Sequence, residues 1–268
     1  MASPIAAHPA DGVTHAAAVE QRRRVPMPMV YRYLGDKRFA YTLPRALALQ
    51  ILQPGNAASL VQHVHGGIWA HKSRAIGQMV YIAYSNRDLT SVMRTAHAHV
   101  KGTDSTGQRY HSLNPELFYF QHATYVDTLF ASIDIFHGGL DRDEKEQLYR
   151  ECCRWYAKYD ISDRAQPATY GEFTEYFDDY CATQLAPSPD AEALRREALH
   201  PPTWYPHKVP AAAIRAMLHP RAAQLLDVDV SAADRAALRA FATTTNLRLA
   251  MLPPKFRLIP SARHDPDD

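Results

Sequence analysis

His122 is the residue whose type and position most strongly suggest chemistry. On a helix over residues 116–136 it shares one stripe with apolar residues, namely Phe118, Val126, Leu129, Phe130 and Ile133. A neutral imidazole buried on such a face needs a partner for each ring nitrogen, or it loses about 1–3 kcal/mol. Tyr125 and Asp127 are expected off this stripe. Periodicity alone favours a core histidine bonded to a hydroxyl or carbonyl, with a metal ligand as the alternative.

An apolar, aromatic helix face around one inward imidazole is also the setting that a heme needs. The porphyrin is a large apolar disc, and its iron takes a protein nitrogen as proximal ligand. His122 is therefore the candidate ligand for iron. Arg94 and His97, three residues apart, share one face of an upstream helix. Arg94 would pair with a carboxylate, or hold a heme propionate or an oxygen-derived anion, and His97 would lie on the distal side.

His63 and His65 form a second candidate metal site. On a strand they would face the same way, and zinc or non-heme iron would need a further ligand that the sequence does not identify. His97 and His99 make a poor metal pair on a helix, because positions i and i+2 point apart. The chain lacks HExxH, GxSxG, P-loop and GxGxxG motifs, so hydrolases, kinases and nicotinamide dehydrogenases lose their usual support.

Helices are the elements that must position these residues. The strongest start signal is Asn114 as N-cap with Pro115 at the first helical position, and the stop is Gly138-Gly139. The helix before Gly102 is expected to place five residues on one apolar face, namely Leu89, Val92, Met93, Ala96 and Val100. Further helices are expected at residues 43–52, 72–84, 141–159, 169–184, 188–199 and 231–252. The first of them is expected to stop at Pro54-Gly55, and a short helix from Ala57 is expected to follow it. Long alternating runs are absent, so the predicted fold class is all-α, a single-domain helical bundle enclosing a heme pocket.

Composition is typical of a globular protein with one domain. The chain has 268 residues, of which 46% are hydrophobic and 22% charged, and its net charge is +2. This gives no argument for nucleic acid, and no run approaches the ~20 apolar residues of a membrane span. We expect disordered tails at 1–25 and 261–268 around a helical domain at 26–260. The three cysteines are expected to be reduced and no secretion signal is visible, so the expected localisation is cytoplasmic.

The segment from Arg94 to Leu129 resembles the mpaB/rubber-oxygenase family of α-helical heme proteins. The resemblance rests on four pieces, namely His97-Ala98-His99-Val100-Lys101-Gly102, Gly107-Gln108-Arg109-Tyr110, Asn114-Pro115 and Phe120-Gln121-His122-Ala123. The upstream LALQILQPGNAAS also looks like the Leu-Gln-x-x-x-Pro helix end of the family. Phe120 stands where the family usually has Trp, and Gln53 where it usually has His. The resemblance covers roughly residues 30–260.

The resemblance implies a heme b cofactor and assigns roles to particular residues. His122 matches the proximal ligand, and Arg94 matches an arginine near the heme. His97 falls where the rubber-cleaving branch has a lysine that can act as a distal ligand. Arg94, with His97 or Lys101, would stabilise the bound oxygen species or anchor propionates. The candidate catalytic residues are thus Arg94 and His97, and the candidate cofactor-binding residues are His122, Arg94 and Lys101.

The leading hypothesis is a heme b-dependent oxygenase, in which O2 binds at the iron held by His122. Its substrate would be an apolar small molecule, because the pocket is expected to be mainly hydrophobic. Oxidative cleavage of a carbon–carbon double bond is implied by the resemblance alone. The alternatives are a non-catalytic heme-binding or heme-sensing protein, a peroxidase-like heme enzyme, a non-heme metal protein using His63 and His65, and a purely structural protein. No nucleic-acid or membrane partner is expected, and a homodimer is one possible assembly.

Overall fold

The computed structural model describes residues 27–263, and most of them are helical. The helices are α2 (Pro28–Tyr33), α3 (Lys37–Gln50), α4 (Pro54–His63), α5 (Ile68–Tyr84), α6 (Thr90–His97), α7 (Pro115–His137), α8 (Arg142–Ala157), α9 (Tyr170–Thr183), α10 (Pro189–Leu199), η1 (Pro206–Lys208), α11 (Ala211–Met217), α12 (Pro220–Leu225), α13 (Ala232–Ala250), α14 (Pro254–Arg257) and η2 (Pro260–Ala262). Within the described part, the named strands β1 (Lys101–Thr103) and β2 (Arg109–His111) form one antiparallel hairpin. The prediction of an all-α fold is confirmed.

The two predicted tails lie almost wholly outside the described residues. The tail at 1–25 is entirely outside them. The tail at 261–268 begins inside η2, where Ala262 is buried, and its last five residues are outside. Within the described range, no helix has the length and apolar character needed to cross a bilayer.

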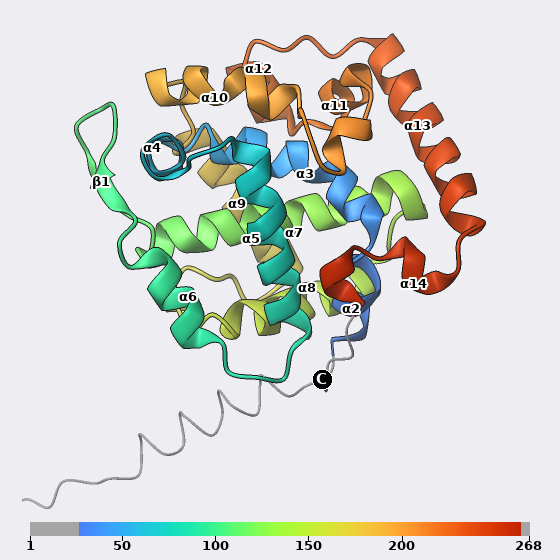
Figure 1. Ribbon diagram of the computed structural model, residues 1–268, viewed down its shortest axis with the longest axis horizontal. Helices are drawn as coiled ribbons and strands as arrows, with labels where there is room; N and C mark the ends of the chain where they lie inside the picture. Colours follow the sequence, from blue (N-terminus) through green and yellow to red (C-terminus); the bar gives the residue numbers. More distant parts are fainter. Residues whose placement is uncertain (1–26, 264–268) are drawn as a thin grey trace, which may run out of the picture.

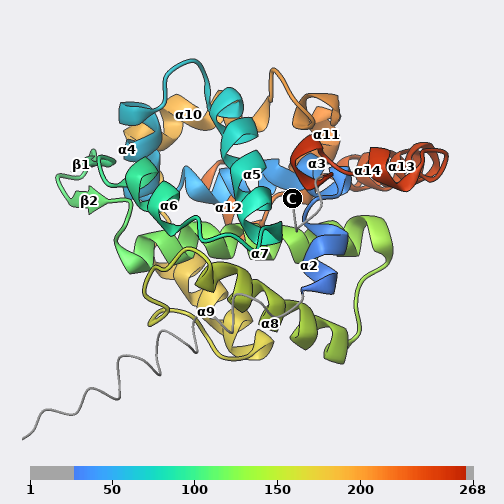
Figure 2. The same cartoon turned by 60° about the horizontal axis from the view of Figure 1, so that its bottom comes forward.

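Helix α7 runs through the middle of the molecule (Figure 1). In the turned view, α3, α4 and α5 lie on one side of α7, and α8 and α9 lie on the other (Figure 2). Side chains are buried along all of α7 and around most of its circumference, as expected for a helix enclosed by other helices. The whole predicted stripe that contains His122 is buried. This central helix therefore carries the candidate ligand into the core.

The residues expected to begin and end α7 do so in the structure. The Asn114 side chain accepts hydrogen bonds from the backbone N–H groups of Glu116 and Leu117, at 3.0 and 3.3 Å. Pro115 occupies the first helical position, where its missing N–H costs nothing. Gly138 ends the helix with a φ of 84°, a left-handed conformation that glycine adopts without a Cβ clash.

Helix α3 packs along α7, and an ion pair links the two. The Arg45 guanidinium contacts the Asp127 carboxylate through two nitrogens, with Nε–Oδ2 at 2.6 Å and Nη2–Oδ1 at 3.0 Å. Each side chain is 15% exposed, so the pair is largely withdrawn from solvent. Asp127, which is off the His122 stripe as predicted, therefore faces α3.

The helix predicted before Gly102 is shorter than expected, so Val100 lies outside it, and its apolar face is not buried. Helix α6 stops at His97, four residues before the hairpin begins, and it has no buried side chain. Val92 is 52% exposed. The segment lies over the outside of α7, so only Leu89 and Met93 pack against the main core, from half-buried positions. The apolar residues of α6 therefore line one side of a cavity at the surface and do not form part of the core.

Other helices also differ from the sequence prediction, since α3 begins at Lys37 and not at residue 43, and α5 begins at Ile68 and not at residue 72. Pro54 begins α4 instead of only ending the preceding helix, because the Gln53 side chain caps it by accepting from the Asn56 N–H at 2.7 Å. After the proline-rich segment 201–210, the chain forms α11 and α12, which were not predicted. Both are short, so neither offers enough helical periods to stand out in the sequence.

Replacing Glu151 with alanine is expected to destabilise the fold by about 2–3 kcal/mol. Glu151 is fully buried on α8, and one of its oxygens accepts from the backbone N–H groups of Met29 and Val30, at 2.8 and 2.9 Å. Alanine would leave both donors at the start of α2 without a partner. Urea denaturation would measure the loss. Glu151→Gln, which keeps one acceptor oxygen, is expected to lose less, and equal losses would contradict this account.

Candidate functional site

The His122 ring lies on the wall of a cavity of about 80 Å³ between α5, α6 and α7. The lining is mainly apolar or aromatic and consists of Ala75, Gln78, Met79, Met93, His97, Phe118, Gln121, His122, Tyr125 and Tyr159. Figures 1 and 2 show α5 crossing α7 and α6 lying near the N-terminal end of α7. The cavity is thus closed on one side by the central helix and on the other by the thin cover of α6.

His122 is buried without a hydrogen bond for either ring nitrogen among the described residues. Burial lowers its pKa to about 3, while the nearby Cys152 backbone acts in the opposite direction without reaching hydrogen-bond geometry. The imidazole is therefore neutral near pH 7, and at least one nitrogen carries a free lone pair. The sequence interpretation of a core histidine bonded to a hydroxyl or carbonyl finds no such partner in the described part of the chain.

Aromatic rings surround His122 on the side of α8. The ring centroid of Trp155 is 4.3 Å from that of His122, and those of Tyr156 and Tyr159 are at 5.0 and 5.8 Å. Trp155 and Tyr156 are fully buried and Tyr159 is 4% exposed. Because they pack directly against the imidazole, they fix its position and exclude water from it.

A second cavity of about 290 Å³, here called the histidine chamber, lies beside the first between α4, α5, α6 and α7. Its basic and imidazole side chains are His63, His71, Lys72, Arg74, His97 and His99. Four residues belong to the walls of both cavities, namely Ala75, Gln78, His97 and Gln121. The two spaces are therefore neighbours separated by shared side chains.

A chain of buried polar side chains links the wall of the histidine chamber to that of the His122 cavity. The Lys72 ammonium donates to Gln50 Oε1 at 2.6 Å and to the Tyr125 hydroxyl at 3.3 Å. The Gln50 amide in turn donates to the Thr124 hydroxyl at 2.7 Å. All four side chains are buried. The chain ties α3 and α5 to α7 within one turn of His122.

The predicted site residues are not all brought together. His97 lies in the walls of both cavities, and its Nδ1 bonds the Met93 carbonyl at 2.9 Å. Arg94 lies outside both linings, where it donates to the Asp160 carbonyl at 2.8 Å and contacts its carboxylate at 3.3 Å. Lys101 is an exposed residue of β1, also outside both linings. The roles assigned to Arg94 and Lys101 stay predictions.

The second predicted metal pair is split by the fold. His63 is the last residue of α4, whereas His65 is exposed in the loop that follows. His63 instead approaches His99, with ring centroids 6.2 Å apart, and its Nε2 bonds the Tyr110 hydroxyl at 3.1 Å. Among residues 27–263 no group of three His, Cys, Asp or Glu side chains is arranged to hold a metal ion.

Sequence reasoning missed two residues of the site. Tyr125 lines the His122 cavity, although its helical position had set it apart from the ligand stripe. It does so because α7 is enclosed, so its side faces are as buried as its predicted face. Lys72 was overlooked, yet it stands four residues before Ile76 and eight before Val80, on the buried stripe of α5. A lone cation on an apolar stripe is the signal that identifies it.

Removing His122 is expected to flatten the pH dependence of the stability of the heme-free protein. Its pKa of about 3 in the fold lies below the ordinary 6.5, so the unfolded chain binds more protons between these values. The stability held above pH 6.5 is therefore lost as the pH falls towards 3, by up to about 1.4 kcal/mol per pH unit. Urea denaturation of the wild type and His122→Leu at several pH values below neutral would measure the difference. His71, whose pKa burial lowers to about 4, is present in both proteins, so parallel curves would contradict this prediction.

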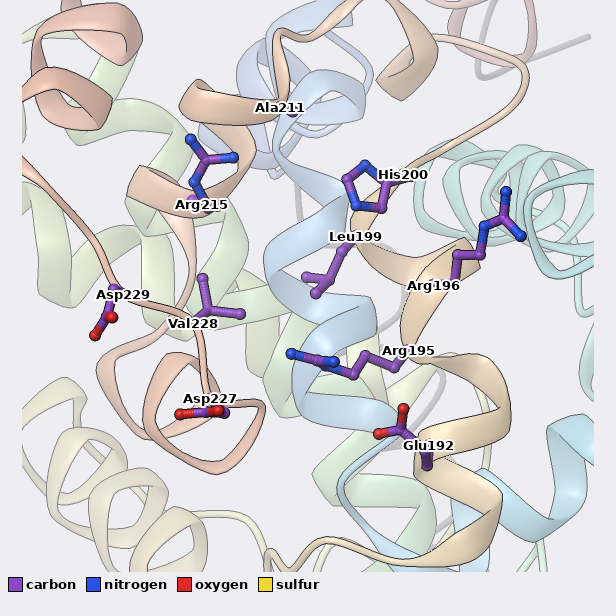
Figure 3. Close-up of a pocket in the computed structure, with 10 residues that line it drawn as sticks. All are labelled: Glu192, Arg195, Arg196, Leu199, His200, Ala211, Arg215, Asp227, Val228 and Asp229. Carbon is purple, nitrogen blue, oxygen red and sulfur yellow. The ribbon is translucent and has the colours of Figure 1, made fainter.

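Another pocket, of about 410 Å³, lies away from His122 between α10, α11 and the loop after α12 (Figure 3). Its wall mixes Arg195, Arg196 and Arg215 with acidic residues. Arg195 donates to the Leu226 carbonyl at 2.7 Å, and Arg215 pairs with Asp234 at 2.5 Å. Arg195 and Arg215 thus join α10 to the end of α12 and α11 to α13, which gives both side chains a structural role.

Comparison with known proteins identifies the family. The model of the family described as "ER-bound oxygenase mpaB/B'/Rubber oxygenase, catalytic domain" matches residues 31–247, from α2 to α13. A search of curated proteins and a search of solved structures each gave no match. The matched range is well over half of the chain and contains both cavities and His122. The chain belongs to the mpaB/rubber-oxygenase catalytic-domain family, a family of oxygenases.

Proposed function

We propose that this protein is a heme b-dependent oxygenase with His122 as the proximal ligand of the iron and an apolar small molecule as substrate. The observation that carries the proposal is a neutral, buried imidazole, without a hydrogen-bond partner among the described residues, on the wall of an apolar cavity. A ring nitrogen left free in such a place costs about 1–3 kcal/mol, which a bound metal would offset. Membership of an oxygenase family gives the reaction class.

The chemistry of the residues around His122 fits a heme, and the space requires one movement. The walls are aromatic and apolar, as the porphyrin faces require. The cavity of about 80 Å³ is too small for a porphyrin, so it must open into the histidine chamber. Helix α6, which contributes Met93 and His97 to the wall and buries no side chain, is the element that can move outward at least cost.

When bound, heme b would supply a redox-active iron for oxygen chemistry. The residues of this chain would hold and shield it. His122 offers a neutral nitrogen, and the Cys152 carbonyl stands ready to accept from the other nitrogen, which would orient the ring. His97 bonds a carbonyl through Nδ1, so that nitrogen bears the proton and Nε2 is left as an acceptor. Burial lowers the pKa of His97, so it would act as a neutral base or ligand contact.

An absorption spectrum of protein produced with a heme supply, with a pyridine hemochrome assay, tests the proposal. The expected result is a Soret band and about one heme b per chain. Oxygen uptake with an unsaturated apolar substrate would separate an oxygenase from a heme carrier or sensor. Absence of both the Soret band and the hemochrome would remove the heme proposal, and heme without oxygen uptake on any such substrate would leave a binding protein.

A further inference from the structure

Lys72 is a buried charge that the proposed function does not use. It is 5% exposed, and its ammonium bonds an amide and a phenol, both neutral. It forms no ion pair with a carboxylate among residues 27–263. An ammonium withdrawn from water without an opposite charge is costly, and structures retain such groups where a ligand supplies the charge.

The side chains around Lys72 are cations and hydrogen-bonding groups that can bind an anion. The wall of the histidine chamber contains Lys72 and Arg74 together with four histidines, and it contains no Asp or Glu. Asn56, 4% exposed on the same wall, has an amide nitrogen, Nδ2, with no acceptor in the described part of the chain. The chamber thus combines a buried cation with a buried hydrogen-bond donor that lacks a partner.

Two histidines of the chamber, His71 and His97, have lowered pKa values, and nearby positive charge contributes to both shifts. The pKa of His71 is lowered to about 4, first by burial and then by the charges of Lys72 and Arg74. The pKa of His97 is lowered by burial, and Lys72 adds to the effect. Both rings are neutral near pH 7, so neither adds charge to that of Lys72 and Arg74.

We propose that the histidine chamber is an anion subsite, which binds a carboxylate of the ligand held in the His122 cavity. Lys72 supplies the charge and Asn56 a hydrogen bond, and the shared wall places the carboxylate next to the apolar space. The carboxylate has two possible sources, a heme propionate or an acidic group on an otherwise apolar substrate. Only the first source rests on the proposed function, because the second requires no heme.

Two ligand pairs that differ only in the acid distinguish these sources. Dodecanoate and dodecanol are titrated calorimetrically into the heme-free protein, and heme and heme dimethyl ester are titrated by absorbance. In at least one pair the wild type is expected to prefer the free acid by about 10- to 100-fold. Lys72→Met, which keeps the volume of the side chain, is expected to erase that preference. Lys72→Arg should keep it, and Lys145→Met, which removes a lysine outside the chamber, should leave it unchanged.

The folding of Lys72→Met is checked by its thermal unfolding. We expect one cooperative transition near that of the wild type, because the gain from removing an unpaired buried charge is opposed by the cost of leaving Gln50 Oε1 without its donor. An acid preference that is absent in both pairs, or that survives in Lys72→Met, overturns the proposal. A preference for dodecanoate that Lys72→Met erases, in a protein that binds no heme, supports the subsite and rejects the heme oxygenase. A preference confined to heme assigns the chamber to a propionate.

Discussion

His122→Leu is expected to abolish heme binding without destabilising the heme-free protein. Leucine fills a similar volume and removes two ring nitrogens that find no hydrogen bond among the described residues. It should therefore recover part of the about 1–3 kcal/mol that those buried nitrogens cost. In a domain of this size, each kcal/mol corresponds to about 2–4 °C in melting temperature. Hemochrome content and the melting curve of the heme-free variant are the two measurements.

His137→Leu is the matched control, because His137 is an exposed histidine at the far end of the same helix. It should leave heme content unchanged. In His122→Gly, added imidazole is expected to restore the Soret band, which separates loss of a ligand from loss of the fold. Heme content that survives in His122→Leu would remove His122 as ligand. A leucine variant that melts several degrees below the wild type would show that the imidazole contributes to core stability.

Asp127→Ala is expected to destabilise the protein by about 3–5 kcal/mol. The substitution would leave the Arg45 guanidinium largely buried, with the Met217 carbonyl at 3.1 Å as its remaining partner in the described structure. The cost comes mainly from the unpaired charge and not from the attraction that is lost. Urea denaturation measures it. Because α3 and α7 form the frame of the molecule, partial unfolding would be visible by circular dichroism.

The double variant Arg45→Met with Asp127→Leu provides the control. Removing both charges together should recover much of the loss, because two apolar side chains of similar size replace a pair whose desolvation is costly. Together with the single variants Arg45→Met and Asp127→Leu, it closes a double-mutant cycle that gives the coupling between the two residues. Losses that simply add in the double variant, or a loss below about 1 kcal/mol in Asp127→Ala, would show that the pair is solvated and contributes little.

The sequence was informative where local chemistry determines structure. Asn114, Pro115 and Gly138 act within one helix, so their types alone predicted both ends of α7. The stripe of His122 followed from the same periodicity. The face of α6 could not be predicted in this way, because apolar spacing describes a helix equally well whether it packs into a core or covers a cavity.

The site itself was only partly visible in the sequence, because its geometry comes from the packing of distant segments. Lys72 and Gln50 meet across 22 residues of sequence, and Lys72 and Tyr125 across 53. No local pattern encodes such a contact. Arg94 shows the opposite case, since its spacing from His97 predicted a shared face, yet the longer side chain reaches Asp160 at the surface. Spacing along a helix does not determine where a flexible side chain ends.

The sparse packing of α6 also bears on kinetics. A helix that buries no side chain and is tied to Asp160 through an exposed ion pair can open locally at a small fraction of the global unfolding free energy. Ligand exchange would then proceed through fluctuations of residues 90–97, and the residence time of a bound ligand would be independent of global stability. Variants that weaken the fold away from this site, such as Asp234→Ala, which removes the partner of Arg215 on α13, would release the ligand at the wild-type rate. Changes in α6 would instead alter how long the ligand stays.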